Sequence, residues 1–170
     1  MATKSSIALL MLAFAADASS EQILIRFNYN DGQWLAPHDE FFSADVDLDA
    51  DQDKDGRLFT VRFDLNGDGA PEYFLRTLCG NGGCEYPIFD GRTYAYLGSV
   101  FGSEVWLLRR RSHALPAIEA FSHLAAMKGT IGRYEFNGAR YEEVSSQDIG
   151  DNETQQLYKR LDAVPRIKAP

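Results

Sequence analysis

Residues 58–78 read LFTVRFDLNGDGAPEYFLRTL, in which two apolar segments flank a polar loop rich in carboxylates. Residues 58–63 carry bulky apolar side chains at alternate positions, and this period of two is typical of a half-buried strand. Residues 73–78 have the composition of a partner strand. The stretch therefore predicts an antiparallel hairpin closed by the polar loop, and it indicates a mainly β protein.

The loop at residues 64–72, DLNGDGAPE, places oxygen ligands at every second position. Gly69 follows the third of them, and glycine permits the positive φ that lets a backbone curl around a cation. An all-oxygen set suits Ca²⁺, whereas Zn²⁺ and copper prefer nitrogen and sulfur. The predicted calcium ligands are the side chains of Asp64, Asn66, Asp68 and Glu72 and the backbone carbonyl of Ala70. The alternative is an Asx-rich turn between two strands that binds no ion.

Four pieces of the chain, DLNGDGAPEYFLR, CGNGGC, IFDGRTY and YEFNGARY, follow one another in this order. The first resembles the short calcium loops of FG-GAP repeats, in which a ninth-position carboxylate replaces the twelfth-position glutamate of an EF-hand. Here the twelfth residue is Leu75. Together the pieces resemble small secreted bacterial proteins of unassigned function, which carry such a loop, a strand, a CGxxGC loop and hairpins with DG or NG turns. The resemblance implies a secreted, calcium-binding β protein and no particular activity.

Six aspartates alternate along residues 45–55 and form a second candidate cation loop. A loop that begins at Asp51 has Gly56 in place but meets Phe59 at the ninth position. A loop that begins at Asp47 has an aspartate at the ninth position but lacks the glycine. The candidate ligands of this second site are Asp47, Asp49, Asp51, Asp53 and Asp55. The alternative is a charged loop without an ion.

Residues 1–18 have the pattern of a secretory signal peptide. Lys4 gives a positive start, residues 7–16 form an apolar core, and the Ala-Asp-Ala sequence that ends at Ala18 fits a small-x-small cleavage site. The alternative is a buried first helix. The apolar run is too short to cross a bilayer, and we expect no membrane span elsewhere. Cleavage would place the protein in the periplasm or outside the cell.

Cys79 and Cys84 are the only cysteines and lie five residues apart in a glycine-rich loop. In an exported protein such a pair is expected to form a disulfide, which we predict here. One alternative is a redox pair, which usually has two intervening residues. The other is half of a zinc site, which needs two further ligands.

The remaining sequence predicts short strands joined by turns. Residues 86–97 and 131–144 read as hairpins around Asp90-Gly91 and Asn137-Gly138. Residues 113–128 are ambiguous, because their apolar spacing is helical while the family resemblance suggests a strand. For this segment we favour a short helix.

A C-terminal helix is predicted between a cap at Asp151 or Asn152 and a stop at Pro165. We therefore predict a mainly β fold, an antiparallel meander or small sandwich with one or two short helices. We expect one β-rich domain over residues 19–165 and a flexible tail over residues 166–170.

The formal net charge of −8 argues against a nucleic-acid partner, because phosphates demand a basic surface. The three histidines show no metal-ligand pair spacing, and the chain has neither a P-loop nor a dinucleotide-binding glycine motif. The sequence leaves enzyme activity open and favours its absence.

The leading hypothesis is a secreted or periplasmic β module with a structural calcium loop, which acts by binding an unidentified protein or ligand. The first alternative is an envelope inhibitor of a basic enzyme such as lysozyme, because a compact acidic domain suits a basic target. The second is a small hydrolase whose site is assembled across loops. The sequence does not identify the partner or the oligomeric state.

Overall fold

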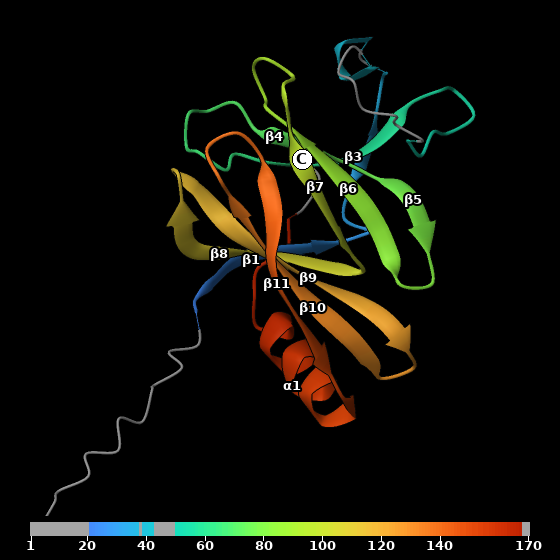
Figure 1. The fold of residues 1–170 in the computed structure, drawn as a ribbon. Coiled ribbons are helices and arrows are strands. Elements are labelled where there is room, and N and C mark those ends of the chain that lie inside the picture. The colour runs from blue at the N-terminus through green and yellow to red at the C-terminus, as the bar shows by residue number, and fades with distance from the viewer. Residues whose placement is uncertain (1–20, 38, 43–49, 168–170) are drawn as a thin grey trace, which may run out of the picture.

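The computed structural model describes residues 21–37, 39–42 and 50–167, which form two antiparallel sheets, a short 3₁₀ helix at Asp39–Phe42 and one α-helix. Figure 1 shows the two sheets one above the other, with the α-helix on the far side of one of them. The mainly β, antiparallel fold with a C-terminal helix is thus confirmed. None of the helices within these ranges has the length and apolar character needed to cross a membrane.

The first sheet, sheet A, has five strands in the order β1-β8-β9-β10-β11. All of its pairings are antiparallel, and β8 to β11 follow one another as a meander. The strands are β1 (Ile23–Asn28), β8 (Glu104–Ser112), β9 (Leu115–Ala125), β10 (Lys128–Phe136) and β11 (Tyr141–Ile149).

The second sheet, sheet B, has six strands, five of them in the order β2-β3-β4-β6-β5, with β7 also paired to β6. The predicted hairpin lies at its centre, where Phe63 of β3 faces Glu72 of β4. The chain leaves sheet B after β7 and enters sheet A at β8, so that Ser103 stands between the sheets. The strands are β2 (Gln33–Leu35), β3 (Leu58–Phe63), β4 (Glu72–Leu75), β5 (Thr77–Gly80), β6 (Gly83–Phe89) and β7 (Tyr96–Gly102).

The main core lies between the sheets and draws large apolar side chains from both. Phe27 of sheet A contacts Phe74 and Tyr86 of sheet B edge-on, with ring centroids 5.1 and 5.3 Å apart. Edge-to-face packing of this kind is a favoured aromatic geometry, and it fixes one sheet against the other.

Helix α1 (Asp151–Asp162) covers the outer face of sheet A. Its Leu157 and Leu161 are buried against a cluster that includes Trp106. The helix begins one or two residues earlier than its predicted caps imply, because Gly150 is the N-cap and donates its N–H to the Glu153 carboxylate at 2.9 Å. It ends before Pro165, as expected.

The helix predicted over residues 113–128 is wrong, because this segment forms strand β9. Ala117 and Phe121 pack toward α1, whereas Ile118 and Ala120 face the core between the sheets. A strand buried on both faces carries apolar residues at nearly every position, and this pattern hides the period of two.

The predicted flexible tail is also wrong at its start. The Ile167 N–H donates to the Arg26 carbonyl at 2.9 Å, and the Ile167 side chain is buried in the main core. Pro165 accepts a hydrogen bond from the Arg26 N–H in turn. The free backbone edge of β1 therefore binds the C-terminal chain as far as Ile167. Residues 168–170 and the predicted signal peptide lie outside the described residues.

Candidate functional site

The acidic loop, residues 64–72, joins β3 to β4 as predicted. Gly67 and Gly69 adopt φ of 81° and 84°, a left-handed conformation that other residues rarely take. A Cβ at either glycine would meet no atom within 4 Å, so the conformation and not crowding requires glycine here.

The side chains of the acidic loop hydrogen-bond mainly to its own backbone. Asp64 accepts N–H groups from Gly67 at 2.7 Å and from Gly69 at 2.9 Å, one on each carboxylate oxygen. Asn66 Oδ1 accepts from the Asp68 N–H, and Asp68 Oδ1 accepts from the Ala70 N–H. These are Asx turns, the arrangement that the sequence offered as the alternative to a cation site.

Glu72 differs from the other loop carboxylates because it is buried, with 1% of its surface exposed. Its Oε2 accepts the Leu65 N–H at 2.6 Å, and its Oε1 accepts the Asn66 amide at 3.1 Å. Burial raises the pKa of Glu72, and the negative charges of Asp64 and Asp90 raise it further. Within the described residues Glu72 has no ion pair with a basic side chain.

Arg92 is a basic residue that contacts the acidic loop, and the sequence did not predict this contact. It donates through Nε to Asp68 Oδ2 at 2.7 Å and through a terminal nitrogen to the Asp68 carbonyl at 2.6 Å. The hydrogen bond from Arg92 lowers the pKa of Asp68. Arg92 reaches the loop because the predicted two-residue turn at Asp90-Gly91 is a longer loop, in which Asp90 accepts the N–H groups of Arg92 and Thr93.

Within residues 21–37, 39–42 and 50–167 no three His, Cys, Asp or Glu side chains are grouped so that they could hold a metal ion. The predicted calcium ligands thus lie in one loop, but their side-chain oxygens do not point toward one common centre. Asp64 faces backbone amides, Asp68 faces Arg92, and Glu72 is turned into the protein. The donor set nevertheless remains all oxygen and includes a buried carboxylate without a basic partner, which fits the chemistry of Ca²⁺.

The described part of the second candidate site is neutralised by arginines. Asp51 pairs with Arg76 at 2.7 Å, and Asp53 accepts from both the backbone and the side chain of Arg57. Asp55 lies 3.8 Å from the same Arg57 guanidinium. Asp47 and Asp49 lie outside the described residues.

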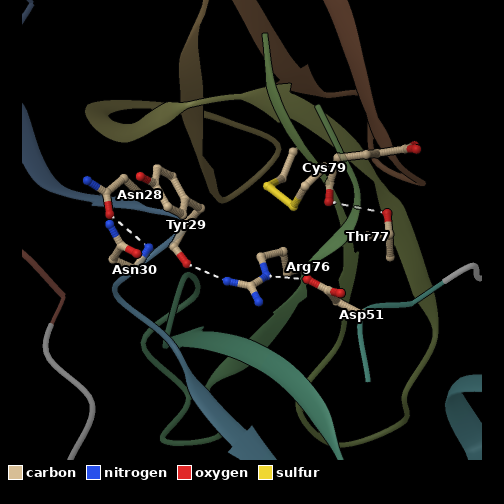
Figure 2. Close-up of a disulfide and its surroundings, with 9 residues drawn as sticks. Asn28, Tyr29, Asn30, Asp51, Arg76, Thr77 and Cys79 are labelled. Carbon is tan, nitrogen blue, oxygen red and sulfur yellow. Dashed lines mark hydrogen bonds and ion pairs between the residues drawn. A yellow bond between two sulfur atoms is a disulfide. The ribbon is translucent and has the colours of Figure 1, made fainter. Parts of the chain in front are cut away.

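The predicted disulfide joins Cys79 of β5 to Cys84 of β6 across the turn of this hairpin (Figure 2). Gly83 sits at the turn with φ of 140°, and a Cβ there would lie 2.2 Å from the carbonyl carbon of Gly102. The turn of the hairpin therefore packs closely against the end of β7, near the point where the chain crosses between the sheets.

A pocket of about 510 Å³ opens beside the disulfide, within the range of pockets that hold small molecules. In Figure 2, Tyr29 lies to the left of the S–S bond, and Arg76 and Asp51 lie below it. The pocket is formed by segments that are far apart in the sequence, so no local motif predicts it. It is lined by Tyr29, Asp51, Arg76, Cys79, Gly80, Asn81, Gly83, Cys84, Ser103 and His123.

Arg76 of this pocket is held by several contacts. Its Nε donates to Asp51 Oδ2 and its NH1 donates to the Tyr29 carbonyl, both at 2.7 Å. Its guanidinium also lies 3.8 Å from the centroid of the Phe59 ring, a cation–π contact. Arg76 is thus held in one position with its charge matched by Asp51.

His123 contributes no acid–base pair to the pocket. Its Nε2 lies 3.2 Å from the Tyr158 hydroxyl of helix α1, whereas the Asp51 carboxylate is paired with Arg76. A hydrolase of the histidine–carboxylate type needs these groups in contact. Among the described residues the pocket therefore offers binding groups and no catalytic pair.

No family model matches the chain. A search of curated proteins and a search of solved structures likewise returned no match.

Proposed function

We propose that this protein is an exported β module that binds calcium at residues 64–72 and uses the ion to stabilise a surface that binds a ligand. The observation that carries the calcium proposal is Glu72, a buried carboxylate at the end of an acidic loop whose pKa is raised by burial and by two neighbouring aspartates. A bound cation would relieve this unfavourable charge. The disulfide supports export, because such bonds persist in oxidising compartments.

The charge balance of the loop supports the same proposal. Asp64, Asp68 and Glu72 contribute three carboxylates, and the negative charge of Asp90 also raises the pKa of Glu72. Arg92 supplies one positive charge, bound to Asp68. Calcium would replace Arg92 at Asp68 and draw Glu72 and the Ala70 carbonyl toward a common centre.

Thermal unfolding with and without calcium tests the proposal. Extracellular modules bind calcium with dissociation constants of about 10⁻⁴ to 10⁻³ M. At calcium near ten times that constant, binding contributes about 1.4 kcal/mol, which raises the melting temperature of a domain this size by about 3 °C. Mg²⁺ should act poorly, because it demands a smaller octahedral cage.

Two variants test whether the calcium-induced melting shift comes from residues 64–72. Asp64→Ala and Glu72→Gln should each abolish the calcium-induced shift, because each removes a charged oxygen ligand. Asp148→Ala is the matched control, since Asp148 lies on exposed strand β11 and should leave the shift intact. Equal melting curves in EDTA and in several millimolar calcium would mean that the loop is an ordinary Asx turn.

A second candidate function, inhibition of a basic enzyme, is favoured by strand β11. This is an edge strand of sheet A, and its residues 142–148 are all exposed. Glu142, Glu143 and Asp148 make the strand acidic, which complements a basic surface. Binding to lysozyme that is released by salt, and that a Glu143→Lys variant loses, would support this candidate.

A further inference from the structure

We propose that the pocket beside Cys79–Cys84 binds a neutral saccharide, with the Tyr29 ring against the face of the sugar. Asp51, Arg76 and Asn81 would bind its hydroxyl groups. The inference rests on the ligand-binding part of the proposed function, and none of the lining residues comes from the calcium loop.

The charge of the pocket argues for a neutral ligand. Arg76 and Asp51 carry opposite charges and are paired at 2.7 Å, so that they nearly cancel. An anion such as a phosphate would have to compete with Asp51 for Arg76, and a cation would have to compete with Arg76 for Asp51. A ligand with many hydroxyl groups can instead bind both partners without separating them.

The pocket has hydrogen-bonding capacity beyond its internal contacts. Within the described residues, hydrogen bonds engage Nε and NH1 of Arg76 and Oδ2 of Asp51, which leaves one nitrogen and one oxygen for a ligand. The Ser103 hydroxyl donates to the Phe121 carbonyl and can still accept. Planar groups such as a guanidinium, a carboxylate and the Asn81 amide match the vicinal hydroxyls of a sugar ring, because each presents two polar atoms side by side.

The apolar part of the pocket includes Tyr29 and the Cys79–Cys84 disulfide. Tyr29 is 48% exposed, although an aromatic ring favours burial, and the disulfide supplies a further apolar surface. A ligand that is apolar throughout would leave the polar groups desolvated and unpaired. A sugar has hydroxyls at its rim and C–H groups on its faces, so it satisfies both parts of the lining.

The pocket is also preorganised for binding. Arg76 is fixed by Asp51, by the Tyr29 carbonyl and by the Phe59 ring, and the disulfide closes the hairpin that carries Asn81. Groups that are already held in place lose little conformational freedom when a ligand binds. A fixed site of this kind is suited to a rigid sugar ring.

The test is a titration of the isotope-labelled protein with cellobiose, maltose, lactose and N,N′-diacetylchitobiose, followed by amide chemical shifts. Glucose 6-phosphate serves as the anionic comparison. At least one neutral disaccharide should shift the amide signals of Tyr29, Gly80, Asn81 and Gly83 in a saturable way. Glucose 6-phosphate should bind more weakly than that disaccharide.

Variants assign the binding to the pocket. Tyr29→Ala should weaken binding about threefold to tenfold, the loss expected for one stacked ring, whereas Tyr29→Phe should retain most of it. Asn81→Ala should weaken binding too. Asn30→Ala is the matched control, because Asn30 is exposed and lies one residue from Tyr29 but is not part of the lining.

Three results would overturn the inference. They are the absence of saturable shifts with every disaccharide, stronger binding of glucose 6-phosphate, and unchanged affinity in Tyr29→Ala. Repeating the titration in EDTA separates this inference from the calcium proposal. Saccharide binding with no calcium-induced melting shift would refute only the calcium site, and the reverse result would refute only the saccharide site.

Discussion

Glu72 shows how a single buried residue can couple pH, calcium and stability. Its carboxyl group has a pKa raised above the ordinary value of 4.5, because burial disfavours the charged form. The folded protein therefore binds a proton at Glu72 more readily than the unfolded chain does. The resulting contribution to stability is fully present below pH 4.5 and is lost as the pH rises through the raised pKa of the folded state.

Calcium binding should follow the opposite trend, because the ion needs the ionised carboxylate. We expect the calcium-induced melting shift to be largest where Glu72 is ionised and to shrink as the pH falls through the raised pKa of Glu72. Melting curves at several pH values with and without calcium measure this dependence, and an NMR titration of the Glu72 carboxyl carbon measures its pKa. A calcium-induced melting shift that stays constant across the pH range in which Glu72 titrates would contradict its role as a ligand.

Arg92 competes with calcium for Asp68, since its guanidinium occupies both Asp68 Oδ2 and the Asp68 carbonyl. Arg92→Gln should therefore tighten calcium binding severalfold. The same change should slightly lower the melting temperature without calcium, because repulsion in the loop is then unopposed. Calcium titration by calorimetry checks the affinity. Arg140→Gln is the control, because Arg140 pairs with Glu142 on a different hairpin. Weaker calcium binding in Arg92→Gln would contradict the competition.

The β5–β6 hairpin is the element that brings the disulfide to the pocket, and its geometry depends on one glycine. Gly83→Ala would force a Cβ to within 2.4 Å of the Ser103 nitrogen in a backbone conformation that alanine rarely adopts. We expect a loss of about 2 kcal/mol or more in the free energy of unfolding, measured in urea. Gly80→Ala in the same hairpin meets no atom within 4 Å and should change that free energy little. Equal stability of the two variants would show that the hairpin backbone shifts to accommodate a side chain at Gly83.

At the scale of the whole molecule, a charged cluster joins strands β1 and β8 of sheet A to helix α1. Arg26 donates to Glu104 and to Asp162, both at 3.2 Å, and the Arg26 and Glu104 side chains are 8% and 11% exposed. Asn28 donates to the second Glu104 oxygen at 3.0 Å. The cluster thus links the first strand of sheet A to the helix on its outer face.

Arg26→Ala should reduce the free energy of unfolding by about 3–5 kcal/mol, because Glu104 would be left buried without its partner. The double variant Arg26→Leu/Glu104→Leu should lose much less, since the charge is then removed together with its partner. Denaturant unfolding of the unchanged protein, the single variant and the double variant shows whether lost charge pairing or lost packing causes the destabilisation. A double variant that is as unstable as Arg26→Ala would mean that packing by the Arg26 side chain, and not charge, dominates.

The sequence alone determined the local elements of this protein. Alternation in residues 58–63 and the glycine at Gly69 predicted the β3–β4 hairpin, because strand period and positive φ are local properties. The Cys79–Cys84 disulfide and the C-terminal helix were predicted for the same reason, since close spacing and one apolar stripe are sufficient. The calcium ligands are predicted from spacing in the same way and await the experiments above.

Only the tertiary structure decided where these elements meet. Strand β9 could not be distinguished from a helix in the sequence, because it is buried against both the inner core and α1. Arg92 reaches Asp68 from 24 residues away, and Arg76 joins Tyr29 across 47 residues. The pocket exists because sheet pairing and the core between the sheets bring distant segments to one place, and that arrangement depends on long-range packing that no local pattern records.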